Sequence, residues 1–289
     1  MASAAVEPND LFSVKGLVAV ITGGGSGIGL MMTQALESNG AIVYIIGRRK
    51  EVIEKAAATA KHGNIRPIQA DVTNTADLER AAAEIKSAVG YLNVVVANSG
   101  ITGPKAPSLS GASSEPTLSE FRDRLLGTDQ AAFTNTFHVN ITGVHNTIAA
   151  FLELLDEGNK RGNLKQKSQI IATSSIGAYN RVPIAGYAYG PSKAAVVHMM
   201  KQFASSLVPY SIRSNVIAPG FYPSDMTVAI QAAKPGKEWP KNVVPEQRFG
   251  DAEDIAGTIL YLVSRAGAYV NGNVLLTDGG RLGVIPSSY

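Results

Sequence analysis

The sequence of 289 residues contains no cysteine. Disulfide bonds, cysteine-based zinc sites and a cysteine nucleophile are therefore excluded. Histidine is also scarce, and neither a His-x-x-x-His pattern nor an acidic partner pattern of the kind that binds zinc accompanies it. The four histidines are His62, His138, His145 and His198. We therefore predict that the protein has no metal site.

The chain has little excess charge of either sign and no long apolar run. Lys and Arg number 26 and Asp and Glu number 23, so the formal net charge is only +3. A dedicated nucleic-acid-binding protein would concentrate basic charge on one face, and a membrane span needs about 20 consecutive apolar residues. The first residues, MASAAVEPND, do not resemble a secretory signal. We therefore expect a cytoplasmic protein with no nucleic-acid partner and no membrane contact.

Apolar residues make up 45% of the chain, and they gather in strand-like runs that alternate with helical segments. Continuous apolar strands are typical of a sheet covered on both faces, and strand–helix alternation favours parallel strands with right-handed crossovers. We therefore predict an α/β protein with a single-domain Rossmann fold, a doubly wound parallel sheet of about seven strands with helices on both faces. The expected strands are 17–21, 42–46, 65–68, 93–96, 169–172, 212–217 and 273–276. The expected helices are 31–36, 50–62, 75–89, 137–155, 191–208 and 252–263.

No repeat and no domain-scale linker divides the chain, so we predict one domain over 1–289, with 1–14 as an N-terminal extension. Two stretches interrupt the alternation. Residues 102–117 are rich in Gly, Ser and Pro and predict a loop insert, after which helical character resumes near 118–126. Residues 221–245 are rich in proline and predict a lid over a substrate. The alternative for each stretch is a plain surface excursion.

A glycine-rich turn, TGGGSGIG, occupies Thr22–Gly29 directly after the first expected strand. Glycine permits close backbone approach, and the start of the following helix offers free N–H groups and partial positive charge to a pyrophosphate. A strand, a glycine turn and a helix in this order predict a dinucleotide site. The alternative is a glycine-rich turn that binds nothing.

Two arginines stand where dinucleotide sites often place an acid. The second expected strand ends at Ile46-Gly47 and is followed by Arg48 and Arg49. An acid at this position would bind the adenosine ribose hydroxyls, whereas arginine can bind a 2′-phosphate with charge-assisted hydrogen bonds. The pair favours NADP(H) over NAD(H). The alternative, stronger for Arg49 than for Arg48, is a solvated charge at the start of a helix.

Tyr189 and Lys193 are four residues apart, a spacing that places both on one face of a helix if Pro191 lies in its first turn. An ammonium group near a phenol favours the phenolate and lowers the tyrosine pKa toward the working range of a proton donor. Upstream, the strand that ends near Ala172 is followed by Thr173-Ser174-Ser175, whose hydroxyls can donate to a substrate oxygen.

Together these motifs resemble the short-chain dehydrogenase/reductase family over about residues 15–280. Asp71-Val72, Asn98-Ser99-Gly100, Pro219-Gly220 and Asp278-Gly279-Gly280 match further family markers in family order. The resemblance implies catalytic roles for Asn140, Ser175, Tyr189 and Lys193, with Ser174 as a rival to Ser175. With the motifs above, it implies a cofactor site made of Gly23, Gly25, Ser26, Gly27, Ile28, Gly29, Arg48, Arg49, Asp71, Val72, Asn98, Ser99, Gly100, Tyr189, Lys193, Pro219, Gly220, Ser224 and Met226.

Some positions depart from the family pattern. The interval from Ser175 to Tyr189 is slightly longer than usual, and so is the interval from Gly100 to Asn140, by a larger amount. Ser99 replaces the usual alanine. Ser224 replaces the usual threonine and keeps a hydroxyl for the nicotinamide amide.

The resemblance implies reduction of a ketone by hydride transfer. Tyr189 would donate the proton, Ser175 would hydrogen-bond the same oxygen, Lys193 would hold the ribose, and Asn140 would keep a water beside Lys193. The sequences around Tyr189 and after Pro219 resemble most closely a branch of the family that contains 3-ketoacyl reductases. The alternatives are a non-catalytic NADP-binding regulator and an NAD-dependent alcohol dehydrogenase. The family also implies a homodimer or homotetramer.

Several residues near the motifs have two interpretations. Tyr187 is a wall of the cleft or a packing residue, and Tyr179, Phe221 and Tyr222 line the pocket or pack elsewhere. Met199 and Met200 are core or subunit-contact residues, and Trp239 covers the substrate or packs in the lid.

Overall fold

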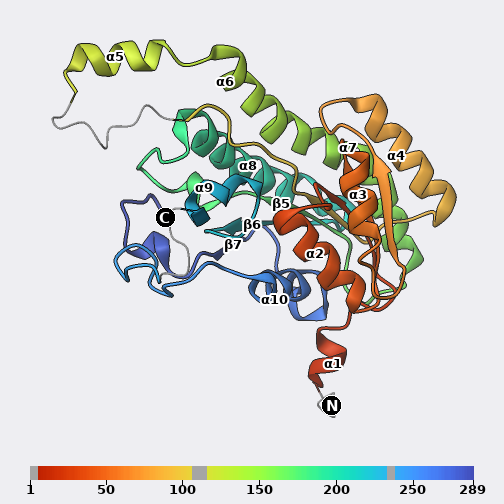
Figure 1. The fold of residues 1–289 in the computed structure, drawn as a ribbon. Coiled ribbons are helices and arrows are strands. Elements are labelled where there is room, and N and C mark those ends of the chain that lie inside the picture. The colour runs from red at the N-terminus through yellow and green to blue at the C-terminus, as the bar shows by residue number, and fades with distance from the viewer. Residues whose placement is uncertain (1–5, 106–115, 233–237) are drawn as a thin grey trace.

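The computed structural model describes residues 6–105, 116–232 and 238–289. Its centre is a seven-stranded parallel sheet with the order β3-β2-β1-β4-β5-β6-β7, so the predicted Rossmann fold is confirmed (Figure 1). The strand order reverses between β1 and β4, and in open α/β sheets ligands bind at the carboxyl ends of the strands beside such a reversal. The strands are β1 (Val18–Thr22), β2 (Ile42–Gly47), β3 (Ile65–Gln69), β4 (Val94–Ala97), β5 (Gln169–Thr173), β6 (Arg213–Pro219) and β7 (Val274–Thr277).

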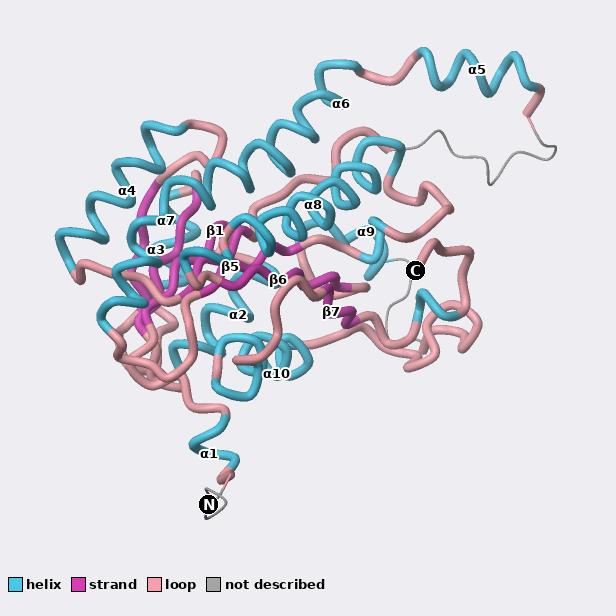
Figure 2. Tube along the Cα trace, turned by 180° about the vertical axis from the view of Figure 1, so that it is seen from behind, coloured by secondary structure: helices cyan, strands magenta, loops and turns pink. Residues whose placement is uncertain are grey.

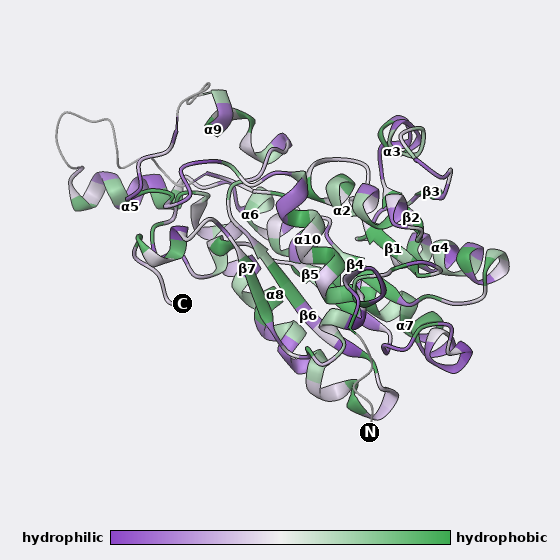
Figure 3. Ribbon diagram, turned by 90° about the horizontal axis from the view of Figure 1, so that it is seen from below, coloured by the Kyte–Doolittle hydropathy of each residue, from purple (hydrophilic) through white to green (hydrophobic). Residues whose placement is uncertain are grey.

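Helices cover both faces of the sheet, as the alternation predicts. They are α1 (Pro8–Leu11), α2 (Gly27–Ser38), α3 (Lys50–Ala57), α4 (Thr75–Ala88), α5 (Leu118–Leu126), α6 (Gln130–Phe137), α7 (Gly143–Arg161), α8 (Gly186–Ser206), α9 (Val228–Ala232) and α10 (Ala252–Val263). One face is packed by α4, α7 and α8 through side chains such as Phe151 and Val196. The other is packed by α2, α3 and α10 through side chains such as Met32 and Ile259. The apolar strands between these two layers are visible in Figure 3.

The helix that carries Tyr189 and Lys193 starts earlier than predicted. It begins at Gly186, so Pro191 lies inside α8 and not in its first turn. Proline cannot donate to the carbonyl four residues before it, so one helical hydrogen bond is missing there. Nearby, the Ser192 hydroxyl donates to the Tyr189 carbonyl oxygen at 2.7 Å.

The predicted helix 137–155 is part of a longer assembly. It begins at Gln130 with α6, passes through a π-helix at His138–Thr142, and continues as α7 to Arg161. A π-helix adds one residue to a turn, and such insertions are often found at functional sites. Hydrophobic periodicity alone does not reveal a single added residue.

Of the predicted 102–117 insert, residues 106–115 lie outside the described residues. The helix expected near 118–126 is α5, which begins at a capping box between Thr117 and Glu120 and buries none of its residues. Figures 1 and 2 show α5 projecting away from the body of the protein, with α6 leading back toward it. Of the predicted 221–245 lid, residues 233–237 lie outside the described residues, and the part before them contains a 3₁₀ turn, Asp225–Thr227, and α9.

Candidate functional site

The glycine-rich turn connects the end of β1 to the first turn of α2. Gly23 and Gly27 have positive φ angles of 66° and 49°, a conformation that L side chains rarely adopt. A Cβ on Gly29 would lie 2.1 Å from the Gly23 carbonyl oxygen, so only glycine permits this close return of the chain. The free N–H groups at the start of α2 are therefore open to an anion.

The turn is fastened to the end of β4. The amide of Asn98 donates to the Thr22 carbonyl oxygen at 3.0 Å, and the backbone N–H groups of Asn98 and Ser99 donate to the Thr22 hydroxyl at 3.0 and 3.1 Å. These bonds hold Gly100 at the same edge of the sheet. Asn98 thus contributes to the site by holding the backbone of the glycine-rich turn in place.

Arg48 and Arg49 follow β2, and each has a carboxylate neighbour. The Arg48 guanidinium lies 3.8 Å from Asp71, and the Arg49 guanidinium lies 3.4 Å from Asp225. Burial alone would raise the pKa of Asp71, but hydrogen bonds from Thr73 and the charge of Arg48 hold it below its ordinary value. Both arginines remain more than half exposed, so their surface pairs are weak and can be exchanged for a bound anion.

These elements surround two adjoining hollows, of about 590 and 180 Å³, at the carboxyl ends of the strands. Every residue predicted for the cofactor lines one hollow or both. The glycine turn leaves room that a Cβ would fill, the start of α2 lines the larger hollow, and two guanidinium groups line it as well. The residues present therefore fit a dinucleotide with its pyrophosphate at the turn.

Tyr189 and Ser175 lie together, and the Ser175 hydroxyl is a hydrogen-bond partner of the phenol. Gly177 lies close to both side chains. A Cβ at this position would lie 3.2 Å from the Tyr189 ring and 3.3 Å from the Ser175 oxygen, so there is little room for a larger residue. The Lys193 ammonium donates to the Thr173 carbonyl oxygen at 2.9 Å and lies 5.8 Å from the Tyr189 ring centroid. The predicted catalytic trio is thus gathered at the end of β5.

The expected lowering of the Tyr189 pKa by Lys193 is wrong for the protein's own groups. Burial raises the pKa of Tyr189, and the hydrogen bond with Ser175 offsets this only in part. Burial likewise lowers the pKa of Lys193 to about 8. Desolvation disfavours both charged forms, so the phenol keeps its proton and is set up as a donor.

Asn140 lies in the π-helix, buried behind the two hollows. Its side-chain oxygen accepts from the Ile101 N–H at 2.8 Å, and its amide donates to the Ile101 carbonyl and the Ser192 hydroxyl, both at 2.9 Å. The side chain therefore holds backbone in place. The water expected beside Lys193 stays a prediction.

The hydroxyl of Ser174 has a structural role. It is buried and donates to the Lys193 carbonyl oxygen at 2.8 Å. Ser175 instead lines both the larger cofactor hollow and a further cavity beside it. The geometry favours Ser175 over its rival.

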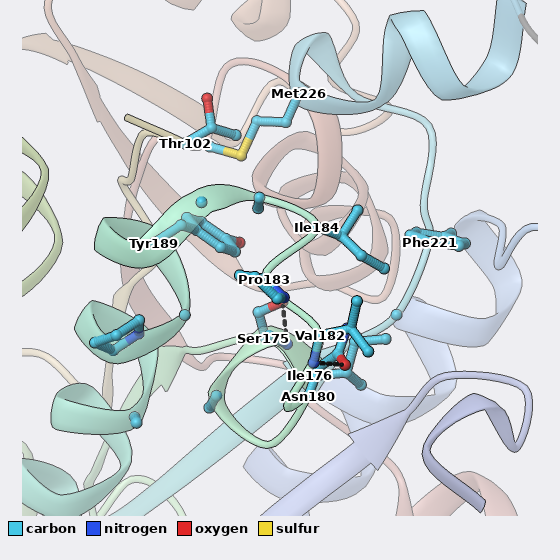
Figure 4. A pocket seen from close by; sticks show the side chains of 18 of the residues that line it. Thr102, Ser175, Ile176, Asn180, Val182, Pro183, Ile184, Tyr189, Phe221 and Met226 are labelled. Atoms are coloured by element: carbon cyan, nitrogen blue, oxygen red, sulfur yellow. Dashed lines mark hydrogen bonds between the residues drawn. The ribbon is translucent and has the colours of Figure 1, made fainter. Parts of the chain in front are cut away.

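The further cavity has a volume of about 520 Å³ and joins the cofactor cleft at Ser175, Tyr189 and Met226 (Figure 4). Most of its lining is apolar. Residues that the sequence did not single out are Thr102, Ile176, Gly177, Ala178, Asn180, Arg181, Val182, Pro183, Ile184, Ala185, Gly186, Gly190, Ala194, Thr227, Ile230 and Arg281. The irregular stretch between Ser175 and Tyr189 supplies many of these lining residues. In the sequence, the only sign of their role was that this interval is longer than the family pattern.

The aromatic residues with two interpretations are now placed. Tyr187 and Phe221 line the cavity, and Tyr222 lines the larger cofactor hollow. Tyr179 packs against Tyr289 with ring centroids 5.1 Å apart. Trp239 is stacked at 5.4 Å on Phe221, so it backs the cavity wall without lining it. Met200 is buried in the core, with Met199 packed against the same cluster.

Among the described residues, His, Asp and Glu side chains form no group of three that could hold a metal ion. Within the same ranges, no helix is long and apolar enough to cross a membrane.

The chain matches the family model described as enoyl-(acyl carrier protein) reductase over residues 23–281. It is 54% identical over 285 residues to the short-chain dehydrogenase/reductase PhomF of Diaporthe leptostromiformis, covering 97% of this chain and 96% of that protein. The chain belongs to the short-chain dehydrogenase/reductase family. It is thus an oxidoreductase of that family.

This short-chain dehydrogenase/reductase is also similar to a curated sequence and to a solved structure from Pseudomonas aeruginosa. The rhamnolipid-biosynthesis 3-oxoacyl-[acyl-carrier-protein] reductase is 31% identical over 270 residues, with 93% of this chain and 97% of that protein covered. The solved complex of RhlG with NADP has a TM-score of 0.75 and 30% identity, covering 94% of this chain and 98% of that one.

Proposed function

We propose that this short-chain dehydrogenase/reductase uses NADP(H) to reduce the ketone of a small organic or ketoacyl substrate to an alcohol. The observation that carries the proposal is the position of Tyr189 and Ser175, which line both the cofactor cleft and the apolar cavity. A carbonyl held in the cavity beside these two hydroxyls would face the cofactor side of the cleft.

The bound nicotinamide supplies the hydride, and the protein's residues supply position and protons. Tyr189, whose pKa is raised by burial, keeps its proton at neutral pH and donates it to the oxygen that becomes the alcohol. Ser175 hydrogen-bonds the same oxygen and stabilises the negative charge that grows there. Lys193 stands beside Tyr189 to hold the cofactor ribose, and Asn140 keeps the surrounding backbone in place.

The preference for NADP(H) rests on Arg48 and Arg49, which line the cofactor cleft where a ribose-binding acid is absent. A guanidinium can bind the 2′-phosphate, whereas an acid would repel it. The likeness to the RhlG–NADP complex supports this preference. The 31%-identical relative named as a 3-oxoacyl-[acyl-carrier-protein] reductase supports a ketone as the group reduced.

The test is NADPH oxidation by the purified protein with a panel of ketones. We expect turnover that falls at least 100-fold in Tyr189→Phe, since removing a positioned proton donor typically costs 10²–10⁴-fold. Tyr187→Phe is the matched control, because Tyr187 lines the same cavity without a lysine four residues on. Both variants should bind NADPH as the wild type does.

The outcomes separate the alternatives. NADPH binding with no turnover of any carbonyl compound would point to a non-catalytic NADP-binding regulator. Turnover that prefers NADH would point to an NAD-dependent alcohol dehydrogenase. Equal turnover of the wild type and Tyr189→Phe would remove the proposed proton donor.

We also propose that the protein assembles as a homodimer or homotetramer, as the family resemblance implies. Light scattering on the purified chain tests this, since the monomer has a mass of 30.3 kDa.

A further inference from the structure

Among the described residues that line the apolar cavity, one cation is buried. Arg281 lines the cavity, although only 6% of its surface is exposed. Its guanidinium lies 4.6 Å from the ring centroid of Phe221, which is itself part of the cavity wall. Figure 4 shows Phe221 on the side of the cavity across from Tyr189. The charge therefore stands at the end of the cavity remote from the reacting groups.

The charge of Arg281 has no counter-ion among the described residues. Within the described ranges, no carboxylate lies within ion-pair distance of it, and its hydrogen bond runs from Nη1 to the Val243 carbonyl oxygen at 2.7 Å. A guanidinium offers five N–H donors. Burial lowers the pKa of Arg281 from its ordinary value, and the more distant Asp278 only partly opposes this. A buried charge without a counter-ion is costly, and proteins normally pair it with one.

The rest of the lining excludes a protein partner inside the cavity. The lining residues that the structure describes include no Asp or Glu, and the further cation among them, Arg181, is exposed. The other lining residues are mainly small or apolar, such as Ile176, Val182 and Ile184. An occupant that matches this surface is apolar along most of its length and carries an anion at one end.

We propose that Arg281 binds a carboxylate of the substrate, so that the enzyme reduces apolar, ring-sized ketones that carry a carboxylate group remote from the reacting carbonyl. This inference rests on the proposed function. A carboxylate carries one charge and two acceptor oxygens, which suit a single guanidinium. A phosphate would bring a second negative charge, and the described part of the cavity lining has no other buried cation to balance it.

The first experiment measures binding without turnover. In the presence of NADP⁺, isothermal titration calorimetry compares 2-naphthoate with 2-naphthamide, which has the same shape but no charge. We expect the wild type to bind the carboxylate at least 10-fold more tightly than the amide. Arg281→Gln should abolish this preference, Arg281→Lys should restore part of it, and Arg181→Gln should leave it intact as the matched control. Unchanged NADPH affinity in each variant shows that the fold is preserved.

The inference is overturned if the wild type binds 2-naphthoate and 2-naphthamide equally. This outcome is measured on the wild type alone, so it does not depend on the folding of any variant. It is also overturned if Arg281→Gln retains the preference for the carboxylate.

A second experiment separates this inference from the proposed function. Turnover of 6-acetyl-2-naphthoate is compared with turnover of its carboxamide, and Arg281→Gln should raise KM at least 10-fold for the acid only. Turnover of neutral ketones with no preference for the acid would sink the carboxylate site and leave the reductase standing. Binding of 2-naphthoate that depends on Arg281, without turnover of any ketone, would sink the reductase and leave the carboxylate site standing.

Discussion

The side chain of Asn140 pairs with the backbone of Ile101 through two hydrogen bonds, accepting at 2.8 Å and donating at 2.9 Å. A third bond, to the Ser192 hydroxyl, extends the contact to α8. One buried amide thereby joins the π-helix, the segment after β4 and the helix that carries Lys193. Gly100 lies inside this junction, since a Cβ there would be 3.1 Å from the Asn140 oxygen and 3.2 Å from the Lys193 ammonium.

Asn140→Ala is expected to destabilise the protein by about 1–3 kcal/mol, because it leaves buried backbone groups of Ile101 without partners. Denaturant unfolding measures the change. Asn146→Ala, a partly exposed position in α7, is the control and should change stability by less than about 0.5 kcal/mol. Equal unfolding midpoints for wild type and Asn140→Ala would show that the amide does not hold the junction.

Arg48→Ala is expected to weaken NADPH binding roughly 10-fold or more and to leave NADH binding nearly unchanged, because a hydrogen bond to a charged group contributes about 1.5–3 kcal/mol. Fluorescence titration with both cofactors measures the ratio. Arg66→Ala, at an exposed position on β3, should affect neither cofactor. Parallel losses for NADPH and NADH would remove the argument that Arg48 reads the 2′-phosphate.

Asp225→Asn is expected to tighten NADPH binding by about two- to fivefold, because it releases Arg49 from an exposed ion pair that contributes at most about 1 kcal/mol. The gain should shrink as salt is added, since surface charges are screened. NADPH titrations at low and high salt measure the change. Together with Arg49→Ala and the variant that carries both substitutions, they form a double-mutant cycle. A gain that persists in the Arg49→Ala background would have another origin.

Lys193 predicts a pH dependence of stability. Its folded-state pKa of about 8 lies below the ordinary value of 10.5, so between these pH values the unfolded chain binds the proton more. Stability from this group therefore rises with pH across that window. The unfolding free energy of the wild type relative to Lys193→Met should grow by roughly 3 kcal/mol from pH 7 to about 10.5.

The control for this profile is Lys201→Met, at an exposed position on the same helix, which should give a flat difference over the same range. A flat difference for Lys193→Met as well would mean that its burial does not disfavour the charged form.

The sheet and the cofactor cleft were predictable because their signals are local. The apolar runs of β1, β2, β4, β5 and β6 are strands buried on both faces, and the motif residues follow strands whose carboxyl ends meet at one edge. The glycine turn after β1 and Asn98 after β4 are far apart in the sequence, but identifying the two strands that precede them is enough to predict that they meet.

The substrate side was less predictable because its residues meet only through the tertiary fold. Arg281 is four residues beyond β7, and nothing in its neighbourhood shows that it is buried against Phe221. The direction of the Tyr189 pKa also depends on burial, which a Tyr-x-x-x-Lys spacing does not measure. The π-helix escaped prediction because a single added residue leaves the apolar pattern on either side intact.

That added residue also lets two helices stay in line while the turn between them is widened. A π-turn takes in one residue more than an α-turn, so α6 and α7 continue in nearly the same direction on either side of it. Deleting one residue within His138–Thr142 would close the wide turn to an ordinary one and leave α6 aligned with α7. The loss would fall on Asn140, whose three hydrogen bonds start from the wide turn itself.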